Sequence, residues 1–514
     1  MKQRISMLAA FFTMAASIWA QTTLNEANFP DANFRKALAA ALSVAEGNHI
    51  SAEKIAATKK LDVSAQAIAN LKGIELFKAL TELYCNDNQL ESLDLSQNTA
   101  LEVVSCYDNS LTVLDVSKNA VLTRLYCYEN RLTALDVTKN TALTKLVCYD
   151  NRLNVLNVSK NTLLQELYCG DNDLTELVVL QNAALTKLVC YNNQLNSLDL
   201  SHNALLENLY CGGNQLTAIN LSQNQLLKEL SCYGNTLSTL DISHNAVLKT
   251  IDCHDNQLTS LNLTQNVKLE ELYCYENLLT ELDTSCNPQL TQIWCDNNQL
   301  SSLDLSKNTQ LISIDCYKNR LTSLNISQNA NLSILNCFEN FLSQLDTSKN
   351  PQLTQLWCDD NSLSSLNLSR NATLSKLFCS NNRLTELDVS HNPSLTQLWC
   401  DGNLIDGSKM EALVNSLPTV HTGNFTVIDT KSGHEGNVCT KSQVNTAKRK
   451  GWTVLDNNAG TEVEYTGSDE MTSVSYIENS PKNVNYFSLD GIKLPKNTTK
   501  KGVYIVGGRK ILVK

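Results

Sequence analysis

The chain has 514 residues, and its 52 aspartates and glutamates outnumber its 41 lysines and arginines, which gives a net charge of −11. This acidic balance argues against nucleic acid or an anionic membrane surface as the main partner. The length exceeds what one ordinary hydrophobic core supports, so the chain needs several domains or an architecture that grows by repetition.

The N-terminus has the pattern of a secretory signal peptide. Basic Lys2 and Arg4 precede an apolar run that ends near Trp19 and is too short to span a membrane. Small residues at its end predict cleavage after Ala20, so residues 1–20 are expected to be removed. No cysteine lies near this point, which argues against a lipid anchor. No later segment has the apolar length of a membrane span.

Residues 21–79 are predicted to form an N-terminal cap. The segment from Asn28 to Arg35 leads into a predicted helix that runs through Leu42. Such a cap shields the open edge of the first repeat that follows it.

Residues 80–403 repeat a unit of 21 residues sixteen times, without an insertion or a deletion. Cysteine recurs at this interval from Cys85 to Cys400, and two columns of asparagine begin at Asn88 and Asn98. A fixed period of this size predicts a solenoid of stacked rungs.

Each rung is expected to contain one short strand and an extended return. Alternation along the strand places Leu83 and Cys85 inward and Tyr84 outward. Twenty-one residues leave no room for a strand and an ordinary helix, so the far wall should be extended or a short 3₁₀ turn. The amide of Asn88 can donate and accept at once, and is expected to bond backbone groups along the stack.

The sixteen cysteines of the column are predicted to be buried thiols. On neighbouring parallel strands their Cβ atoms would lie about 4.8 Å apart and point the same way, whereas a disulfide needs roughly 3.8 Å and converging vectors. Their spacing also lacks the short CxxC pairs of zinc sites, so no metal and no cofactor are expected. Cys286 and Cys439 lie outside the column, and their distance in sequence argues against a mutual disulfide.

This unit resembles the leucine-rich repeat, and most closely the 21-residue, cysteine-bearing variety of internalin J-like bacterial surface proteins. The positions of Leu83, Cys85, Asn88 and Leu90, repeated through residues 80–403, carry the resemblance. It implies a β-rich, right-handed leucine-rich-repeat rod of about sixteen rungs, and attachment to host or neighbouring cells. Repeats are scaffolds, so the resemblance indicates fold more strongly than function.

The period stops after residue 403, and residues 404–466 are predicted to form a C-terminal α/β cap. We expect helices over 408–417 and 441–450, and strands over 425–428 and 452–455.

Residues 467–514 are predicted to be a β-rich tail that follows a polar linker. The strand Gly502–Val506 and the basic final segment Gly508–Lys514 resemble the C-terminal sorting domains of the type IX secretion route. The alternative is a small β-rich terminal cap without a sorting role.

Two outward columns of the repeats carry most of the aromatic residues. The column before each cysteine holds Tyr84, Tyr126, Tyr168, Tyr210, Tyr273, Trp294, Trp357, Phe378 and Trp399. The column after it holds Tyr107, Tyr128, Tyr149, Tyr191, Tyr233, Tyr275, Tyr317 and Phe338. An acidic series runs beside them: Asp87, Asp108, Glu129, Asp150, Asp171, Asp255, Glu276 and Asp360.

Large rigid aromatic side chains dominate binding hot spots, so this face is the candidate ligand-binding surface. Trp-Cys-Asp triplets recur in the C-terminal half, where rung stability does not require them. The predicted ligand-binding residues are Trp294, Trp357, Trp399, Asp296, Asp359, Asp401, Tyr273, Tyr275, Tyr317, Phe338 and Phe378.

The sequence thus predicts a secreted, surface-displayed adhesin, a monomeric rod that binds a protein or a glycan and is not an enzyme. The first alternative is a structural stalk, because aromatics also stack between rungs for stability alone. A remote alternative is a hydrolase, since His254 lies beside Asp252 and Asp255 on the aromatic face.

Overall fold

The computed structural model describes residues 22–469, 475–476, 502–506 and 509–513. The predicted signal peptide and most of the predicted sorting region lie outside these residues. The chain divides into two compact units, a first that ends at Leu353 and a second that begins at Thr354.

A small cap opens the described part of the first unit. Its elements are β1 (Thr22–Thr23), α2 (Ala32–Leu42), β2 (His49–Ile50) and α3 (Ala52–Ala57). The carboxylate of Asp31 accepts hydrogen bonds from the backbone amides of Asn33 and Phe34 and so starts α2. The buried rings of Phe29 and Phe34 meet edge to face, with centroids 5.9 Å apart. Helix α2 ends at Leu42, as predicted.

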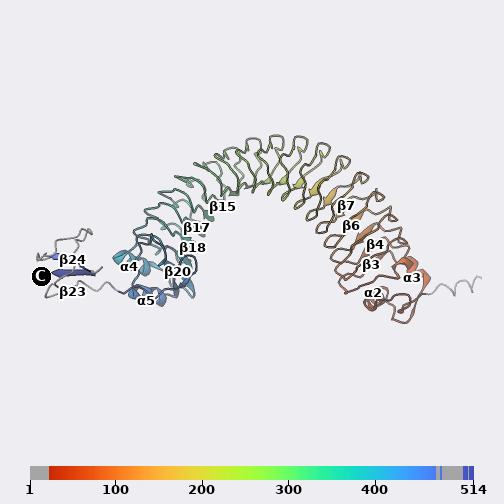
Figure 1. Cartoon of the computed structure of the whole chain (residues 1–514), viewed down its shortest axis with the longest axis horizontal. Coiled ribbons are helices and arrows are strands. Elements are labelled where there is room, and N and C mark those ends of the chain that lie inside the picture. The colour runs from red at the N-terminus through yellow and green to blue at the C-terminus, as the bar shows by residue number, and fades with distance from the viewer. Residues whose placement is uncertain (1–21, 470–474, 477–501, 507–508, 514) are drawn as a thin grey trace, which may run out of the picture. The chain divides into compact units, whose positions relative to one another are not determined.

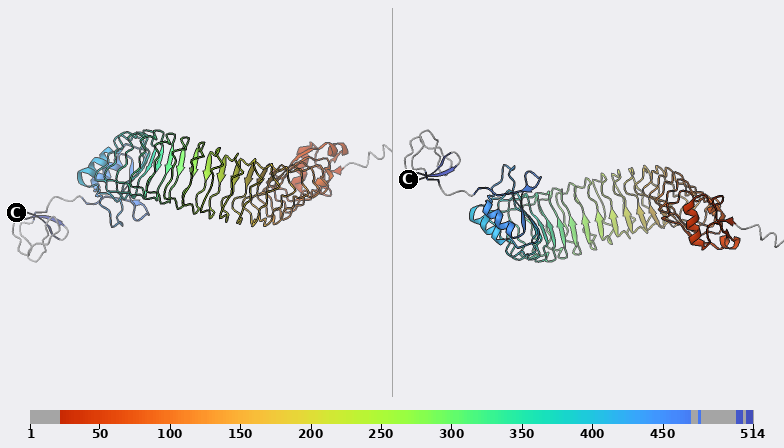
Figure 2. Two further views of the ribbon diagram at one scale, coloured as in Figure 1. Left: turned by 90° about the horizontal axis from the view of Figure 1, so that it is seen from above. Right: turned by 90° about the horizontal axis from the view of Figure 1, so that it is seen from below.

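Short parallel strands, one per repeat, form the sheet of the first unit (Figures 1 and 2). They are β3 (Lys60–Asp62), β4 (Glu82–Tyr84), β5 (Val103–Ser105), β6 (Arg124–Tyr126), β7 (Lys145–Val147), β8 (Glu166–Tyr168), β9 (Lys187–Val189), β10 (Asn208–Tyr210), β11 (Glu229–Ser231), β12 (Thr250–Asp252), β13 (Glu271–Tyr273), β14 (Gln292–Trp294), β15 (Ser313–Asp315) and β16 (Ile334–Asn336).

The register of these strands follows the sequence period, since Leu83 pairs with Val104 and Leu209 with Leu230. Strand β3 pairs with β4 in the same parallel manner. Buried Val63 there takes the place that cysteine has in later rungs. The regular stack therefore begins one strand before the cysteine column, and the short 3₁₀ helix η1 (Ile74–Leu76) belongs to this first rung.

The interior of a rung is apolar. In the rung of β4, Leu83, Cys85, Leu90, Leu95 and Leu101 are all fully buried. Each buried leucine contributes on the order of 2 kcal/mol to folding. From residue 80 to residue 353 the returning wall consists of turns and extended segments without a helix. The predicted leucine-rich-repeat solenoid and its extended far wall are confirmed.

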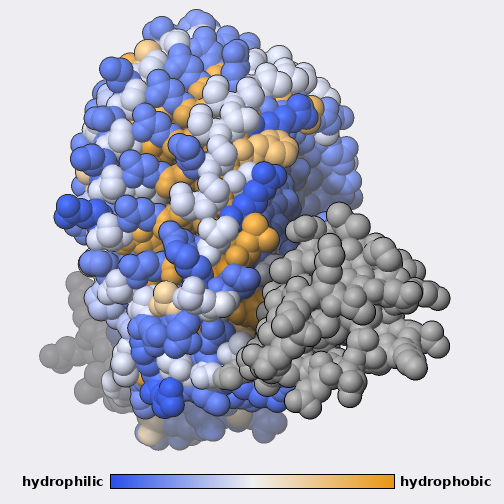
Figure 3. Space-filling model, turned by 90° about the vertical axis from the view of Figure 1, so that its left-hand side faces the viewer, coloured by the Kyte–Doolittle hydropathy of each residue, from blue (hydrophilic) through white to orange (hydrophobic). Residues whose placement is uncertain are grey.

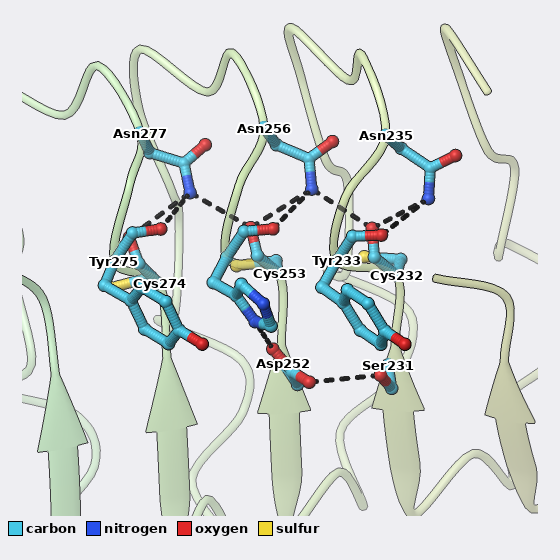
Figure 4. Close-up of polar contacts among 11 residues, drawn as sticks. Ser231, Cys232, Tyr233, Asn235, Asp252, Cys253, Asn256, Cys274, Tyr275 and Asn277 are labelled. Carbon is cyan, nitrogen blue, oxygen red and sulfur yellow. Dashed lines mark hydrogen bonds and ion pairs between the residues drawn. The ribbon is translucent and has the colours of Figure 1, made fainter. Parts of the chain in front are cut away.

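Asparagine side chains tie each rung to the one before it. The amide Nδ2 of Asn109 donates to the carbonyls of Cys85 and Cys106, both at 3.1 Å, and its Oδ1 accepts from the amide of Leu90 at 2.9 Å. In the second column, Nδ2 of Asn119 donates to backbone carbonyls of the preceding rung. Figure 4 shows the first pattern in three consecutive rungs. The predicted role of the asparagines is confirmed.

Two turns explain further repeated residues. The carboxylate of Asp94 accepts from the amide of Ser96 at 2.9 Å, and this bond lowers the pKa of Asp94. The second position after each cysteine of the column is left-handed, with φ of 56° at Asp87 and 61° at Gly213. Asp, Asn and Gly adopt this conformation at the least cost, which accounts for their recurrence there.

The cysteines of the column are fully buried free thiols in both units. Burial raises their pKa, to about 12 for Cys106 and Cys148. Cys286 is exposed on a turn, whereas Cys439 is buried in the second unit.

Thiol titration should show this burial directly. In the folded protein one thiol of the eighteen, Cys286, should react with an alkylating reagent, and the other seventeen (18 − 1) should react only in denaturant. The reason is that a buried thiol of raised pKa offers neither access nor thiolate. Recovery of mostly disulfide-linked cysteine from the intact protein would contradict this expectation.

Replacement of one column asparagine should be costly. Asn235→Ala removes the donor to Cys211 and Cys232 and the acceptor of Leu216. Because these backbone groups would stay buried without partners, we expect a loss of about 3 kcal/mol in the free energy of unfolding, measured with urea. The exposed neighbour Gln215→Ala is the control and should change it by less than about 0.5 kcal/mol.

The second unit contains the same kind of rung, and a C-terminal cap follows its last rung. Its elements are β17 (Gln355–Trp357), β18 (Lys376–Phe378), β19 (Gln397–Trp399), α4 (Gly407–Ser416), β20 (Gly423–Ile428), α5 (Lys441–Arg449), β21 (Trp452–Asp456), β22 (Val463–Glu464), β23 (Ser475–Tyr476), β24 (Gly502–Val506) and β25 (Arg509–Val513). The helices and strands predicted after residue 403 are confirmed within one or two residues at most ends.

The C-terminal cap extends the sheet of this unit. Strand β20 pairs in parallel with β19, and β21 pairs in parallel with β20. The indole of Trp452 is buried and donates to the carbonyl of Pro418 at 2.8 Å. A closing strand with a large buried side chain covers the end of the stack. In the part of the chain that the structure describes, no helix combines the length and the apolar character of a membrane span.

Candidate ligand-binding face

The aromatic columns of the first unit form contacting groups on the outer side of the strands. Tyr273 and Trp294 are paired in register on β13 and β14, and their rings meet edge to face with centroids 5.0 Å apart. The ring centroid of Tyr275 lies 6.3 Å from that of the same indole. Trp294 is 37% exposed. The structure thus brings three predicted site residues together.

A histidine that is not among the predicted ligand-binding residues extends this group. His254 lies flat between Tyr233 and Tyr275, with ring centroids 4.8 Å and 4.2 Å away. Further along the unit, Tyr317 and Phe338 stack at 4.3 Å. Aromatic rings of neighbouring rungs therefore contact one another along parts of this face.

The second unit carries its own aromatic group. Trp357, Phe378 and Trp399 are paired in register on three successive strands. Trp357 stacks on Phe378 at 5.6 Å, and Phe378 meets Trp399 edge to face at 4.9 Å. All three rings are partly exposed. Trp294 belongs to the first unit, so the structure groups two of the three predicted tryptophans.

The aspartates of the Trp-Cys-Asp triplets are engaged within the protein. Asp296 is 3% exposed and Asp401 is 1% exposed. The carboxylate of Asp401 accepts from Ser380 Oγ and from Asn457 Nδ2, at 2.5 Å and 2.9 Å. Half-buried Asp359 accepts from the amide of Ser380 at 2.8 Å. Alternation predicts these side chains outward, but Asp296 and Asp401 are buried, Asp401 against the preceding rung and the C-terminal cap, so the rings form the accessible part of the triplets.

Burial changes the titration of the acidic groups on this face. It raises the pKa of Asp315 to about 7, helped by the charge of Asp296, and it likewise raises the pKa of Asp359 to about 7. Burial also raises the pKa of Asp296, against the hydrogen bond that Tyr317 donates to it. Near neutral pH this part of the face is thus less negative than its composition indicates.

Sequence reasoning missed that lysines already cover some tyrosines. The ammonium of Lys145 lies 5.2 Å from the ring centroid of Tyr168, and that of Lys187 lies 5.2 Å from that of Tyr210. Valines alternate with tyrosines in this column, and the lysines come from the valine-bearing strands. The repeated Lys-Leu-Val strands were the signal in the sequence. These cation–π contacts leave the tyrosine faces less free for a ligand.

The histidine cluster has the geometry of a structural contact more than of a catalytic one. His254 Nδ1 lies 2.5 Å from Asp252 Oδ1, and the hydroxyl of Ser231 donates to Oδ2 of the same aspartate at 3.1 Å (Figure 4). A nucleophilic serine needs a bond to the imidazole, whereas this serine bonds to the carboxylate. Among the described residues no group of three or more His, Cys, Asp and Glu side chains is placed to hold a metal ion.

The side of the molecule that faces left in Figure 1 is mixed in character. Figure 3 shows apolar residues in bands between hydrophilic ones on this side. The acidic series lies beside the tyrosines in the first unit, where burial and the charges of Asp108 and Asp150 raise the pKa of Glu129. The accessible face is therefore aromatic with an acidic margin.

Stacked 21-residue rungs with a buried thiol in each rung from β4 to β19 define a leucine-rich-repeat solenoid of the cysteine-ladder type. No protein-family model matches the chain. Internalin J of Listeria monocytogenes serotype 4b is 44% identical over 71 residues, which are 14% of this chain and 8% of that protein.

Solved structures extend this similarity over most of the chain. The functional domain of InlJ from Listeria monocytogenes, which includes a cysteine ladder, matches with a TM-score of 0.61 and 34% identity over 80% of this chain and 82% of that one. A leucine-rich-repeat protein of Leptospira interrogans matches with a TM-score of 0.60 and 25% identity, over 71% of this chain and 95% of that one. The chain therefore belongs to the internalin J-like leucine-rich-repeat proteins.

The raised pKa of Asp315 predicts a pH dependence of stability. Asp315 holds its proton more tightly in the folded state than in the unfolded chain, so the protonated carboxyl stabilises the folded state below pH 4. This stabilisation is lost as the pH rises to about 7. Asp315→Asn should remove this part of the slope and stabilise the protein at pH 8 by on the order of 2 kcal/mol, allowing for solvent screening. Urea unfolding between pH 4 and pH 8 measures it.

The exposed Glu281→Gln is the matched control, because it removes one charge without relieving a buried carboxylate. If the wild type and Asp315→Asn lose stability in parallel over this range, the buried carboxylate is not the cause.

Proposed function

We propose that this chain is a secreted, surface-displayed adhesin whose aromatic strand face binds a protein or a glycan on a host or neighbouring cell. The observation that carries the proposal is the gathering of partly exposed aromatic rings into contacting groups, Tyr273 with Tyr275 and Trp294, and Trp357 with Phe378 and Trp399. Rigid aromatic groups held by a scaffold supply large contact area at a low cost in conformational entropy.

Membership of the internalin J-like proteins supports a scaffold for protein interaction. Export follows from the predicted signal peptide, and display from the predicted sorting region at the C-terminus. Both remain part of the proposal, because these segments lie largely outside the described residues.

The acidic residues beside the tyrosines limit the chemical classes of partner that fit this face. Exposed Asp108, Glu129 and Asp150 stand on successive rungs beside the tyrosines, and none of them forms an ion pair among the described residues. A basic patch on a protein, or the hydroxyl groups of a sugar over the indole rings, would complement such a face.

The second candidate function is a structural stalk without a ligand of its own. It is favoured by the contacts that the rings make with one another, since stacked aromatics stabilise neighbouring rungs with or without a partner. In an adhesin the tryptophans contact the ligand, whereas in a stalk they only stabilise neighbouring rungs.

Binding should depend on the tryptophans. The full chain is first screened on protein and glycan arrays, and the partner found is titrated against the triple variant Trp294→Ala, Trp357→Ala, Trp399→Ala. Loss of hot-spot aromatics costs at least about 2 kcal/mol, so affinity should fall roughly thirtyfold or more.

The matched control replaces Val113 and Val155, which are 69% and 67% exposed on the returning wall, by alanine and should leave affinity unchanged. Thermal unfolding of all variants separates lost binding from lost folding. A well-folded triple variant that binds as tightly as the wild type would exclude the tryptophans and favour the stalk.

A further inference from the structure

Three tyrosines near the start of the cysteine column form a continuous stack. The rings of Tyr107 and Tyr128 have centroids 4.2 Å apart and planes 8° from parallel, and those of Tyr128 and Tyr149 lie 4.4 Å apart at 16°. All three side chains are partly exposed. Among the stacked pairs of the described residues, these two alone join one phenol to another.

The backbone holds the three rings at this separation. The amide of Asp108 donates to the carbonyl of Tyr128 at 3.1 Å, and the amide of Glu129 donates to that of Tyr149 at 3.2 Å. Rungs fixed by such bonds cannot slide past one another, because each is also tied to its neighbour by a column asparagine. The stack ends where Gly170 replaces tyrosine in the next rung.

The rings of neighbouring tyrosines lie almost face to face, with planes 8° and 16° from parallel. Rings stacked in this way on successive rungs bring the carbons next to the hydroxyl of one ring, the ortho carbons, near the face of the next ring. Those carbons are where phenoxyl radicals couple.

We propose that Tyr107, Tyr128 and Tyr149 are a site of oxidative tyrosine–tyrosine cross-linking, which joins adjacent rungs through a carbon–carbon bond. The oxidant is a peroxide acting through a haem peroxidase. Each of two phenols loses one electron and one proton, and one hydrogen peroxide is reduced to two waters. The two radicals then form a bond between ortho carbons, and the hydrogens on those carbons move to the oxygens and restore both phenols.

The thiols behind the stack do not intercept the oxidant directly. Cys106, Cys127 and Cys148 are fully buried, and burial raises the pKa of each. Oxidation of cysteine follows thiolate character and exposure, and these residues lack both. The partly exposed phenols are therefore the first groups that an oxidant meets on these rungs.

The test treats the full chain with a haem peroxidase and hydrogen peroxide, isolates the monomer by denaturing electrophoresis, and maps linked peptides by mass spectrometry. We expect peptides joined through Tyr107 and Tyr128 or through Tyr128 and Tyr149, two hydrogens lighter than their sum, together with dityrosine fluorescence. Tyr128→Phe keeps the ring stack but removes the phenol common to both pairs, and should abolish both linked peptides.

A second variant tests whether two phenols stacked in this way are enough for cross-linking, because it should add a new linked peptide. Tyr317 and Phe338 stack at 4.3 Å and 7°, much as the tyrosine pairs do, but one phenol is missing. Phe338→Tyr should create a new linked peptide at this place. The proposal is overturned if the oxidised wild-type monomer contains no linked peptide from the stack, if Tyr128→Phe yields as much, or if Phe338→Tyr adds none.

Discussion

The structure depends on one interaction that recurs in every repeat, the bonding of an asparagine amide to the backbone of its own rung and of the rung before. A turn at this place would otherwise bury carbonyl and amide groups without partners, at a cost of about 1–3 kcal/mol for each group. Asn109 shows the solution, since its Nδ2 serves carbonyls of two rungs while its Oδ1 accepts from Leu90. This bond and the backbone bonds between the rungs together fix each rung against the one before, and hence the position of every outward side chain.

The thiol column follows from the same regularity. A side chain at this position faces the same side chain above and below, so it must be apolar, small and indifferent to like neighbours. Leucine is larger than the site, and serine would bring a hydroxyl that needs a partner in an apolar interior. Cysteine meets the requirement as a small hydrophobe. Val63 meets it in the rung of β3, where the column of cysteines has not begun.

The fold could be predicted from the sequence because its determinants are periodic. The inward leucines, the asparagine bonds, the extended far wall, helix α2 and the helices of the C-terminal cap are all local consequences of residue type and spacing, whereas the short helix α3 was not predicted. The accessible surface was harder to predict. Alternation places Asp296 and Asp401 outward, but whether an outward side chain stays exposed depends on the neighbours one rung away. The cover of Tyr168 by Lys145 likewise depends on a contact between strands, which a single repeat does not contain.

The core and the surface of the stack do not share the same period. Inside, one rung is equivalent to the next, so the core would accept the loss or gain of any whole repeat. Outside, from β6 to β10, tyrosine alternates with valine, and Glu166 separates Lys145 from Lys187 while accepting an ion pair from the first. Removal of the single rung that carries Glu166 would bring the two lysines side by side and leave valine next to valine. On this stretch the surface pattern repeats every two rungs, whereas the core pattern repeats every rung. A pair of rungs is therefore the smallest unit that can be duplicated or deleted without an electrostatic penalty.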